Sequence, residues 1–459
     1  MSKNNESVTL NDNESREGFA SNMGFILASM GGAIGLGNIW MFPYRTGRYG
    51  GAAFIVVYLI VLVLIGIPVL MTEFAIGRKT QSSYTTALKK LLPDTKWYLL
   101  GRVGVINLII TLSFYGVVAG WVTAYIFKSV TGAYKGLSAE QIGMQFGQFI
   151  SSPITVFWFA IILAITAYIV VKGIEKGIEK VSNILLPVLF IMIIFLGIRA
   201  MMLPGAGAGV EFYLKPDFSL INGESIMAAI SQVFFSLGVG CGNLVVYGSY
   251  LDKKNTLTKN TLLVGIGDTA AAILFGFIIF PAAFAYGIQP DAGPPLIFIT
   301  LPTVFSQMTF GLAFGTLFFA LVFMACITST ICILEGVVGY GMDELKWTRQ
   351  KSTIIFTVII FVLGTILAAS YGPLSNILIM GKNLFDFSNE ILVSTIILPL
   401  GGLLMMILVG WVLKPKTLLD EINTGSGIKV NKYYVLTTRY IASIALTVMF
   451  LQSMGILKF

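Results

Sequence analysis

The sequence contains no histidine, and only 11% of its 459 residues are charged. A soluble globular domain has about a quarter of its residues charged, so the composition excludes that class. The absence of histidine removes the commonest general base and metal ligand. Any chemistry in this chain must therefore use carboxylates, hydroxyls, amides and the backbone.

Cysteine is scarce as well. The three cysteines, Cys241, Cys326 and Cys332, all lie in apolar runs. An odd set in apolar sequence indicates neither a disulfide framework nor a zinc site. The tail up to about Glu17 has neither the basic start nor the small-residue cleavage site of a secretory signal, so we expect the first span to be retained.

Catalytic motifs are also missing. Gly35 and Gly37 lack the third glycine of a dinucleotide-binding fingerprint, and no strand precedes them. No lysine lies at the centre of an apolar run, which excludes a phosphate-binding Walker loop. We therefore expect no enzyme. A channel is a weaker alternative, because channels usually build their filters at symmetry axes.

Long apolar runs dominate the chain: 56% of the residues are apolar, and the mean hydropathy is +0.86. A membrane span needs about 20 mostly apolar residues. The sequence predicts an all-α integral membrane protein with a cytoplasmic tail over residues 1–18 and a single transmembrane domain over residues 19–459. It predicts eleven spans, over residues 20–44, 51–76, 100–130, 154–172, 182–202, 225–250, 260–287, 309–340, 352–371, 385–413 and 434–456.

Lys and Arg concentrate in alternate loops between these spans. Such loops face the cytoplasm, so the N-terminus is predicted inside and, after eleven spans, the C-terminus outside. The net charge of +8 then belongs to these loops, and we expect a lipid bilayer as partner and no nucleic acid. Between the seventh and eighth spans, an apolar segment from Gln289 to Gln307 is interrupted by proline and glycine. It is interpreted either as a lid or as a plain surface loop.

The stretch from Gly31 to Pro43 contains four glycines, an asparagine and, at its end, a proline, all of which weaken a helix. Each interior glycine costs a helix on the order of 1 kcal/mol relative to alanine. This predicts a helix that is broken in mid-membrane, which is tolerable only where the exposed backbone lines a cavity. Such a break suits a cation and a small polar solute. Close helix packing through Gly31 and Gly35 is the alternative.

Residues 33–38 (AIGLGN) have an echo at residues 238–243 (GVGCGN), five spans later. A repeat unit with an odd number of spans must be inverted in the membrane. The echo therefore predicts inverted five-helix repeats, spans 1–5 and 6–10, with broken spans 1 and 6, plus an eleventh span. Two interrupted spans at corresponding positions indicate the binding site of a transporter.

Five carboxylates lie within or near the spans: Glu73, Asp268, Glu335, Asp386 and Glu390. Ionisable groups inside a membrane are costly and indicate function. An interior with acids and no Lys or Arg at a span centre favours a cation, either sodium or a proton. The alternative is that a carboxylate braces two helices.

Span eight contains three consecutive hydroxyl side chains, Thr328, Ser329 and Thr330. Hydroxyls together with carbonyl oxygens can hold a hard cation without a buried net charge. Hydroxyls in membrane helices also bond back to their own helix, which is the structural alternative.

Between Arg16 and the eleventh span the chain carries five specific motifs. They are Gly35-Leu36-Gly37-Asn38 with Phe42-Pro43; Gly66-Ile67-Pro68 with Glu73 and Gly77-Arg78; Phe234-Phe235-Ser236-Leu237-Gly238; Ile299-Thr300-Leu301-Pro302; and Asp343-Glu344-Leu345. With these motifs the chain resembles the neurotransmitter:sodium symporters, in particular their bacterial amino-acid branch, some of whose members have eleven spans. The resemblance implies a sodium-coupled secondary active symporter in a bacterial cell membrane that imports L-amino acids by alternating access.

The resemblance also implies two sodium sites and one substrate site. The first sodium site would use Ala33, Asn38, Ser236 and Asp268, the last at a position where the family often has asparagine. The second would use the carbonyls of Gly31, Ile34 and Ala325 and the hydroxyls of Thr328 and Ser329. The substrate site would be lined by Ala33, Gly35, Thr111, Tyr115, Phe235, Gly238, Cys241, Ser329 and Ile333, with Tyr115 on the substrate carboxylate and Phe235 closing over it.

Two gates follow from the same resemblance. The inner gate pairs Arg16 with Asp343, close to Tyr250, and Phe19 replaces the usual tryptophan. Asp386 matches the carboxylate of the outer gate. The position of its usual arginine partner is Met41 in this chain. Arg45, a water bridge or no partner at all are the alternatives for Asp386.

The substrate class follows from small residues. Relatives that carry amines tend to have aspartate where Gly35 stands, so the resemblance implies zwitterionic amino acids. Gly238 and Cys241 leave room for a large apolar or aromatic side chain such as tyrosine, tryptophan or leucine.

Asp268 would make chloride unnecessary and would carry a proton outward on the return step. A transporter of another small organic solute, coupled to sodium or protons, is the alternative function; the individual amino acid, the stoichiometry and the oligomeric state are left open.

Overall fold

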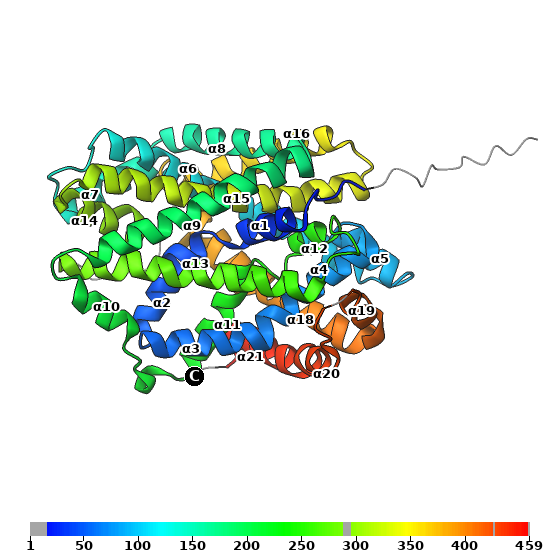
Figure 1. Cartoon of the computed structure of the whole chain (residues 1–459). Coiled ribbons are helices and arrows are strands. Elements are labelled where there is room, and N and C mark those ends of the chain that lie inside the picture. Colours follow the sequence, from blue (N-terminus) through cyan, green and yellow to red (C-terminus); the bar gives the residue numbers. More distant parts are fainter. Residues whose placement is uncertain (1–15, 288–294, 426, 458–459) are drawn as a thin grey trace, which may run out of the picture.

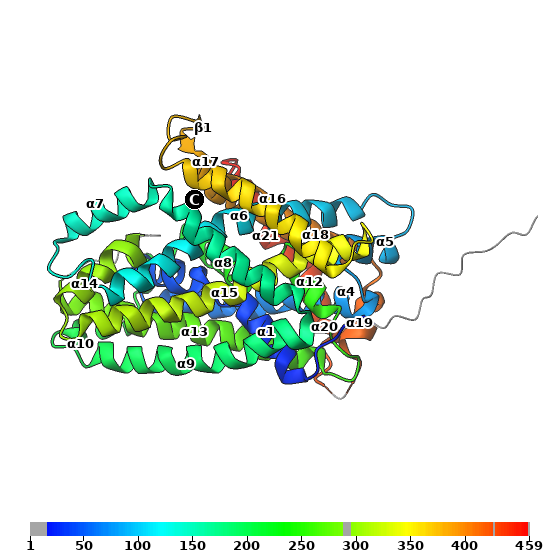
Figure 2. The same ribbon diagram turned by 90° about the horizontal axis from the view of Figure 1, so that it is seen from above.

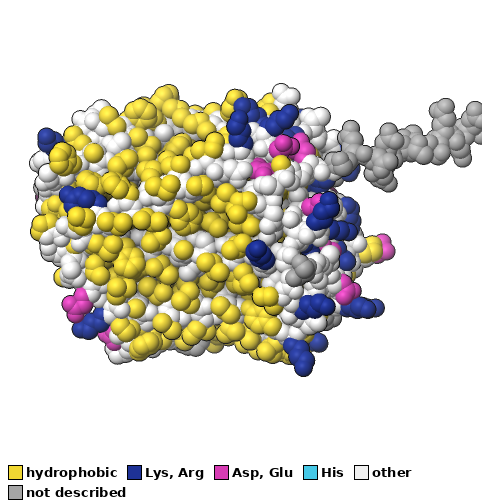
Figure 3. Space-filling view, in the orientation of Figure 1, with side chains coloured by type: hydrophobic (Ala, Val, Ile, Leu, Met, Phe, Trp, Pro, Cys, Tyr) yellow, Lys and Arg dark blue, Asp and Glu magenta, His cyan; other side chains and the backbone are white. Residues whose placement is uncertain are grey.

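The computed structural model describes residues 16–287, 295–425 and 427–457. Long helices run side by side along one common direction and make up most of the described chain (Figure 1). On the face shown in Figure 3, hydrophobic side chains cover the middle, and Lys and Arg gather mainly at the end where the described chain begins. We call this the Arg16 end and the opposite end the Asp386 end. An apolar belt between polar ends is what a bilayer requires, and the all-α membrane architecture is confirmed.

Nine helices among the described residues are long and apolar enough to cross a bilayer, and one bent helix pair makes a tenth. The pair consists of α1 (Asn22–Ala33) and, after a break, the π-helical turn Gly37–Met41 with α2 (Phe42–Arg48). The nine are Ala52–Thr80 (α3, Ala52–Val61, to α4, Ile67–Thr80), α6 (Tyr98–Val130), α8 (Ile154–Val171), Ile174–Met201 (including α9, Lys180–Met201), α13 (Leu257–Ala285), α15 (Gly311–Asp343), α16 (Arg349–Ala369), Leu384–Val412 (α17, Leu384–Asp386, to beyond α18, Leu398–Ile407) and Asn431–Ser453 (α20, Asn431–Leu436, to α21, Ser443–Ser453).

The remaining predicted span, residues 225–250, consists of two short helices, α11 (Gly223–Leu237) and α12 (Asn243–Gly248). Ten of the eleven predicted spans thus match a long helix or the bent pair. The remaining one, the sixth in chain order, is interrupted. The other helices are α5 (Tyr84–Leu91), α7 (Ala139–Ile150), α10 (Ala206–Leu214), the 3₁₀ turn Phe218–Leu220, α14 (Leu301–Gln307) after the π-helical turn Leu296–Thr300, and α19 (Pro415–Ile422).

A short antiparallel hairpin follows α16. Its strands are β1 (Leu378–Ile379) and β2 (Lys382–Asn383), with Leu378 opposite Asn383 and Ile379 opposite Lys382. In Figure 2 the hairpin and α17 lie at the outer edge of the molecule, beyond the end of α16. The hairpin places Asn383 directly before α17, where its side chain accepts a hydrogen bond from the backbone N–H of Asp386.

Both predicted breaks are present. In the first span the helix axis bends by 59° between α1 and the turn that begins at Gly37. In the sixth span Gly238, Gly240 and Gly242 have φ values of +63°, +94° and +82°. This left-handed region is open to glycine at no steric cost, so three glycines in alternation let the chain leave one helix and start another. The inverted relation between the two halves stays a prediction.

The centre of the molecule is the antiparallel pair α6 and α15, each 33 residues long. These two helices pack side by side over much of their length, and α1, α8, α12 and α16 contact α15 around them. The residues that the breaks expose therefore face a wall of helix rather than lipid. This placement satisfies the requirement that irregular backbone in a membrane be enclosed by protein.

The segment between the seventh and eighth spans is folded where it is described. Its first residues lie outside the described part, and from Leu296 to Gln307 it is helical. Leu296, Ile297 and Phe298 are fully buried, and the Phe298 ring lies 5.0 Å from that of Tyr125 and 5.9 Å from that of Trp121. The interpretation as a plain surface loop is wrong for these residues, because they pack as part of the core.

The fifth span begins earlier than the sequence predicts, at Ile174 instead of residue 182. The charged residues of its first turns concealed this start. One of them, Glu179, accepts hydrogen bonds from the backbone N–H groups of Ala20 (2.7 Å) and Ser21 (3.1 Å) and from the Ser21 hydroxyl (2.7 Å). By accepting hydrogen bonds from otherwise unpaired amides at the start of α1, this carboxylate fixes the polar first turns of the fifth span against α1.

A buried ion pair ties α4 to α19. The Arg78 side chain is fully buried, its Nε donates to Glu421 Oε1 at 2.6 Å, and its Nη1 donates to the backbone oxygen of Asn255 at 2.7 Å. Removing one partner of such a pair leaves an uncompensated charge, which costs far more than the pair itself contributes.

We therefore expect Glu421→Gln to lower the free energy of unfolding by ~3 kcal/mol, seen as a lower thermal midpoint of the detergent-purified protein. The control is Glu224→Gln, which removes the partner of Arg48 in a pair that is about half exposed. Its effect should be below ~1 kcal/mol, because water screens that pair. Equal shifts for the two variants would contradict the importance of the Arg78 pair.

Candidate functional site

The two broken spans, α6 and α15 surround one cavity in the middle of the molecule. The empty space among its lining residues amounts to about 630 Å³. All nine residues that the sequence predicts for a substrate site line it: Ala33, Gly35, Thr111, Tyr115, Phe235, Gly238, Cys241, Ser329 and Ile333. The remaining lining residues are Gly32, Leu36, Gly37, Leu108, Phe234, Asn243, Val393 and Leu398.

One end of the cavity is polar and tightly packed. A side chain at Gly35 would place its Cβ 2.7 Å from Tyr115 Oη and 2.9 Å from Ser329 Oγ, so glycine is needed there. The backbone N–H of Leu36 donates to Tyr115 Oη at 3.4 Å, which is a long hydrogen bond. The first break thus presents a weakly bonded backbone amide and a phenol hydroxyl to the same small region. That combination suits a carboxylate.

An aromatic ring covers the cavity at the breaks. A Cβ at Gly37 would lie 2.7 Å from Cδ1 of Phe235, so the ring rests directly on the backbone of the first broken span. The other lining residues are mostly aliphatic or glycine, and none of the lining side chains is charged. The cavity can therefore enclose an apolar group, and any charge on a ligand must be met by backbone dipoles or by ions.

Beside the cavity, Asn38, Ser236 and Asp268 form what we call the Asp268 cluster. Asn38 Nδ2 donates to Asp268 Oδ1 at 2.7 Å and to Ser236 Oγ at 3.0 Å. The Ser236 hydroxyl donates to Asp268 Oδ2 at 2.7 Å. Asn38 Oδ1 accepts from the backbone N–H of Gly35 at 3.0 Å, which ties the cluster to the first break. Ala33, the fourth residue predicted here, ends α1 directly before that break.

Asp268 is fully buried, and among the described residues no Lys or Arg forms an ion pair with it. A buried carboxylate with only neutral partners needs a cation or a proton. The carboxylate, the amide and the hydroxyl supply oxygen atoms, which are the ligands that hard cations prefer. The chemistry of this donor set thus fits a small monovalent cation next to the ligand cavity.

A second group of oxygens lies around the Ser329 hydroxyl, and we call it the Ser329 cluster. Ser329 Oγ is 3.4 Å from the Gly31 oxygen, 3.0 Å from the Ile34 oxygen and 3.0 Å from the Ala325 oxygen. Thr328 Oγ1 lies 3.1 Å from the same Ala325 oxygen. All five residues predicted for a second sodium site are therefore brought together.

The Ser329 hydroxyl has one proton and can donate to only one of those three carbonyl oxygens. Three carbonyl oxygens converging on one hydroxyl oxygen leave electron-rich groups facing one another. Such an arrangement suits a hard cation, which prefers several neutral oxygens when no high charge is available. Gly31 permits the close approach, since a Cβ there would lie 2.9 Å from Cβ of Thr328.

Glu73 contributes to the site indirectly. It is fully buried in α4, and its Oε1 accepts a hydrogen bond from the backbone N–H of Gly240 at 2.6 Å. Gly240 is in the middle of the second break. The carboxylate therefore braces the irregular backbone of the sixth span, which is the structural alternative for this residue.

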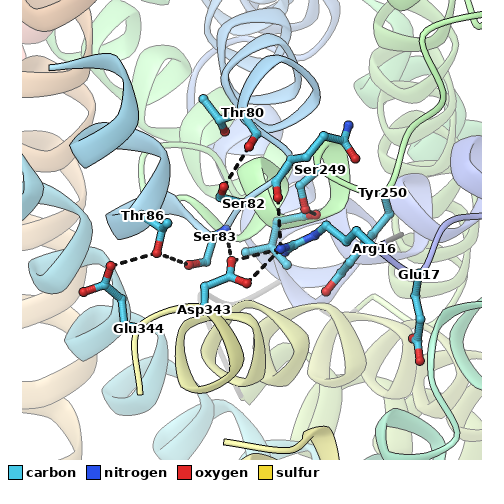
Figure 4. A network of polar contacts seen from close by, with 12 residues as sticks. Arg16, Glu17, Thr80, Ser82, Ser83, Thr86, Ser249, Tyr250, Asp343 and Glu344 are labelled. Carbon is cyan, nitrogen blue, oxygen red and sulfur yellow. Dashed lines mark hydrogen bonds and ion pairs between the residues drawn. The ribbon is translucent and has the colours of Figure 1, made fainter. Parts of the chain in front are cut away.

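The Arg16 end is closed by a network shown in Figure 4. Arg16 Nη1 lies 2.9 and 3.0 Å from the two carboxylate oxygens of Asp343, and its guanidinium lies 4.8 Å from the centre of the Tyr250 ring. Both charged side chains of the pair are only 16% exposed. The backbone N–H of Ser83 donates to the same carboxylate, so the pair fastens the chain before α1 to α15 and α5.

Phe19 and Glu335 extend this closure. The Phe19 ring lies 5.5 Å from that of Phe25 and 6.4 Å from that of Tyr250, so it fills the place next to the ion pair. Glu335 accepts a hydrogen bond from Tyr250 Oη at 2.5 Å and pairs with Arg349 at 2.7 Å. Both carboxylate oxygens of Glu335 therefore bind residues of the network at this end, and Glu335 does not line the cavity.

At the other end, Asp386 accepts hydrogen bonds from Tyr371 Oη at 2.9 Å and from Asn383 Nδ2 at 2.8 Å. Arg45 does not replace the missing arginine at Met41. Its guanidinium donates instead to α11, to the oxygens of Ala228 (3.0 Å) and Gln232 (3.1 Å) and to Ser231 (3.2 Å). The fifth predicted carboxylate, Glu390, is about half exposed and pairs with Lys382.

Of the eight lining residues outside the predicted substrate site, Gly32, Leu36, Gly37 and Phe234 adjoin predicted residues at the two breaks, and the other four need a separate explanation. Asn243 is the counterpart of Asn38 in the internal echo, which is a signal that could have identified it. Leu108 lies three positions before a predicted residue of α6, on the same helix face. Val393 and Leu398 come from the tenth span, and no motif or echo in the sequence marks these two apolar residues.

Comparison with known proteins adds independent information. A family model described as the sodium:neurotransmitter symporter family matches residues 16–140 and 140–458. The uncharacterized sodium-dependent transporter YhdH of Bacillus subtilis is 37% identical over 96% of this chain and 98% of its own length. An uncharacterized sodium-dependent transporter of Haemophilus influenzae is 34% identical over 96% of this chain and 99% of its own.

A solved structure is similar throughout. The crystal structure of MhsT in complex with L-phenylalanine is 41% identical in sequence and superposes with a TM-score of 0.87. The match covers 96% of this chain and 100% of the MhsT chain. The similarity thus covers nearly the whole length of both chains.

Proposed function

Because the chain belongs to the sodium:neurotransmitter symporter family, a family of sodium-dependent membrane transporters and not of enzymes, we propose that it imports L-amino acids with large apolar or aromatic side chains. In this proposal two sodium ions are transported with the amino acid. The Asp268 cluster and the Ser329 cluster hold the ions, and the cavity holds the amino acid.

The observation that carries this proposal is the position of Ser329. Its hydroxyl is at the centre of three carbonyl oxygens, and the same residue lines the cavity. An ion in the Ser329 cluster would fix the broken first span against α15, and the cavity is formed by the same two elements. Ion binding and substrate binding are then coupled through one small region of backbone.

The cavity supports a zwitterionic substrate. Its polar end offers the Leu36 amide, the Tyr115 hydroxyl and the start of the helical turn at Gly37, and the positive end of a half-helix favours a carboxylate. Gly35 leaves no protein charge beside the substrate, so the carboxylate of the substrate can itself face a sodium ion. The apolar remainder suits a large side chain, and the structurally similar MhsT is in complex with L-phenylalanine.

Alternating access needs two ends that open in turn. We propose that the Arg16 end faces the cytoplasm of a bacterial cell, because the lysine-rich loops lie there. The Arg16–Asp343 pair and Phe19 then form the inner closure, and Asp386 with its neighbours belongs to the outer one. Opening the inner closure releases sodium and amino acid together.

The direct test is an uptake panel in proteoliposomes with and without an inward sodium gradient. We expect sodium-driven uptake of labelled leucine, phenylalanine, tyrosine or tryptophan, with little uptake of glycine, glutamate or lysine. Tyramine and phenethylamine should compete at least tenfold more weakly than the parent amino acids, because they lack the carboxylate. Equal competition by these amines, or uptake driven only by a proton gradient, would favour the alternative function.

The second sodium site can be tested by removing its hydroxyls. In Thr328→Ala with Ser329→Ala, two of the oxygens of the Ser329 cluster are lost, and we expect sodium-driven uptake to fall below a tenth of its original rate. The matched control is Thr330→Ala on the same helix, whose hydroxyl bonds to Ile327 and Thr166 and takes no part in the cluster. If the double variant keeps normal uptake with normal sodium dependence, the ion is held elsewhere.

Chloride should be unnecessary because Asp268 supplies a fixed negative charge beside the first ion. Two unit charges ~4 Å apart interact by roughly 4 kcal/mol at an effective dielectric of about 20, before desolvation is counted. A bound chloride would add nothing that this carboxylate does not provide. When sodium leaves, the buried carboxylate must be neutralised, and a proton carried outward achieves this.

We therefore expect uptake to be unchanged when chloride is replaced by gluconate, and Asp268→Asn to lose activity or to become chloride-dependent. The control variant is Asp252→Asn, whose carboxylate is more than half exposed in a loop and should leave uptake unchanged. Wild-type uptake that falls without chloride would contradict this role of Asp268.

A further inference from the structure

Resting on the proposed function, we propose that Asn243 is a specificity-determining residue that makes the site prefer an amino acid with a hydroxylated aromatic side chain, as in L-tyrosine, over phenylalanine. The inference depends on a buried amide that lines the cavity and lacks a full set of partners. It also depends on where this amide lies relative to the carboxylate end of the cavity.

The cavity is elongated between α6 and α15. On α15, Ser329, Ile333 and Gly336 follow one another along one helix face, and a rise of ~1.5 Å per residue separates the first from the last by roughly 10 Å. A Cβ at Gly336 would lie 3.2 Å from Cβ of Asn243 and 2.7 Å from Cδ1 of Leu108. Asn243 therefore lies about two helical turns away from the Ser329 level.

The opposite wall has the same order. On α6, Leu108 and Tyr115 are seven positions apart, so they too are about two turns apart on one face. Tyr115 meets Gly35 and Ser329, whereas Leu108 meets Gly336. A ligand whose carboxylate is at Tyr115 thus points the end of a long side chain toward Leu108 and Asn243.

The Asn243 side chain is 4% exposed, and its Oδ1 has no hydrogen-bond partner among the described residues. Its Nδ2 has only the sulfur of Cys332, at 3.5 Å. Its counterpart in the internal echo, Asn38, has partners for both amide atoms. A buried polar group without a partner is costly, and a native protein keeps one where something else pairs with it.

A phenol hydroxyl can pair with the Asn243 amide better than other side-chain groups can. The oxygen and nitrogen of an amide are assigned from their partners, so either atom can face the cavity. A hydroxyl both donates and accepts, and it pairs with either one. An indole N–H only donates, and a phenyl ring does neither. A short hydroxyl side chain such as that of serine cannot span two helical turns.

The surroundings support a ring that ends in a polar atom. Gly238 and Cys241, which line the cavity, are small. Asn107 Oδ1 and Thr111 Oγ1 are also buried and have no hydrogen-bond partner in the described part of the chain. No charged side chain lines the cavity, so a carboxylate or an ammonium group at the tip of the substrate would be left unpaired. The lining thus selects against charged tips, and among rings it favours one that ends in a hydroxyl.

The test is calorimetric binding to the purified full-length protein in sodium buffer, with L-tyrosine, L-phenylalanine and L-leucine as ligands. We expect tyrosine to bind about tenfold more tightly than phenylalanine, the ratio that one added hydrogen bond to an otherwise unpaired buried group provides. In Asn243→Ala this ratio should fall to about one, mainly by weaker tyrosine binding. In Asn243→Ser, which replaces the amide with a shorter hydroxyl side chain, it should be intermediate.

The matched control is Asn260→Ala. Asn260 is a fully buried asparagine whose amide pairs with that of Asn22, and neither of these two residues lines the cavity. Its loss should leave the tyrosine-to-phenylalanine ratio unchanged, whatever it does to stability. The ratio within each variant is the readout, so partial misfolding does not affect it.

Equal binding of tyrosine and phenylalanine by the wild type would overturn the inference and leave the proposed function intact. A tenfold ratio that persists in Asn243→Ala would overturn the role of Asn243. If none of the three amino acids binds in sodium and the uptake panel is also negative, the proposed function fails, and the inference fails with it.

Discussion

The structure depends on one constraint: inside a bilayer, backbone N–H and C=O groups must find partners within the protein. Two of the spans violate helical pairing in mid-membrane, at the bend after Ala33 and at the three positive-φ glycines of the sixth span. Both breaks are enclosed by α6 and α15, the longest helices described. The freed backbone groups then find partners in the Tyr115 hydroxyl and in the Glu73 carboxylate.

The same constraint explains why charge is so sparsely used. Asp268 is buried among neutral partners, and the Ser329 cluster contains only carbonyl and hydroxyl oxygens. Each arrangement is electrically incomplete without a cation, whereas a side-chain cation would neutralise it permanently. In the proposed function the transported sodium ion is the group that completes each site, so each site must be incomplete without it. Arg16, Arg78 and Arg349 lie away from the cavity, and each pairs with a carboxylate.

The sequence predicted most of this where the physical signal was local. Hydropathy located the spans to within a few residues, and glycine clusters located both breaks. Prediction failed where tertiary contacts outweighed local pattern: the charged start of the fifth span is helical because Glu179 pairs with the amides before α1, and the segment from Leu296 is core because aromatic rings enclose it. The lining residues of the tenth span, Val393 and Leu398, had no signal, since an apolar residue that faces the cavity cannot be told from one that faces lipid by its type alone.

The two ends are closed by different forces, and this difference follows from Met41. At the Arg16 end a guanidinium and a carboxylate, both mostly buried, join segments that are far apart in sequence. At the Asp386 end the carboxylate is held by Tyr371 and Asn383 from its own neighbourhood, and Arg45 is bound to α11. Closure there falls to aromatic packing, with the Trp121 and Phe385 rings stacked 5.7 Å apart. Packing is not screened by salt, whereas a partly exposed ion pair is. By binding α11, Arg45 links the Asp386-end half of the first span to that of the sixth, and the half-exposed Arg48–Glu224 pair adds a second link between the same two half-helices.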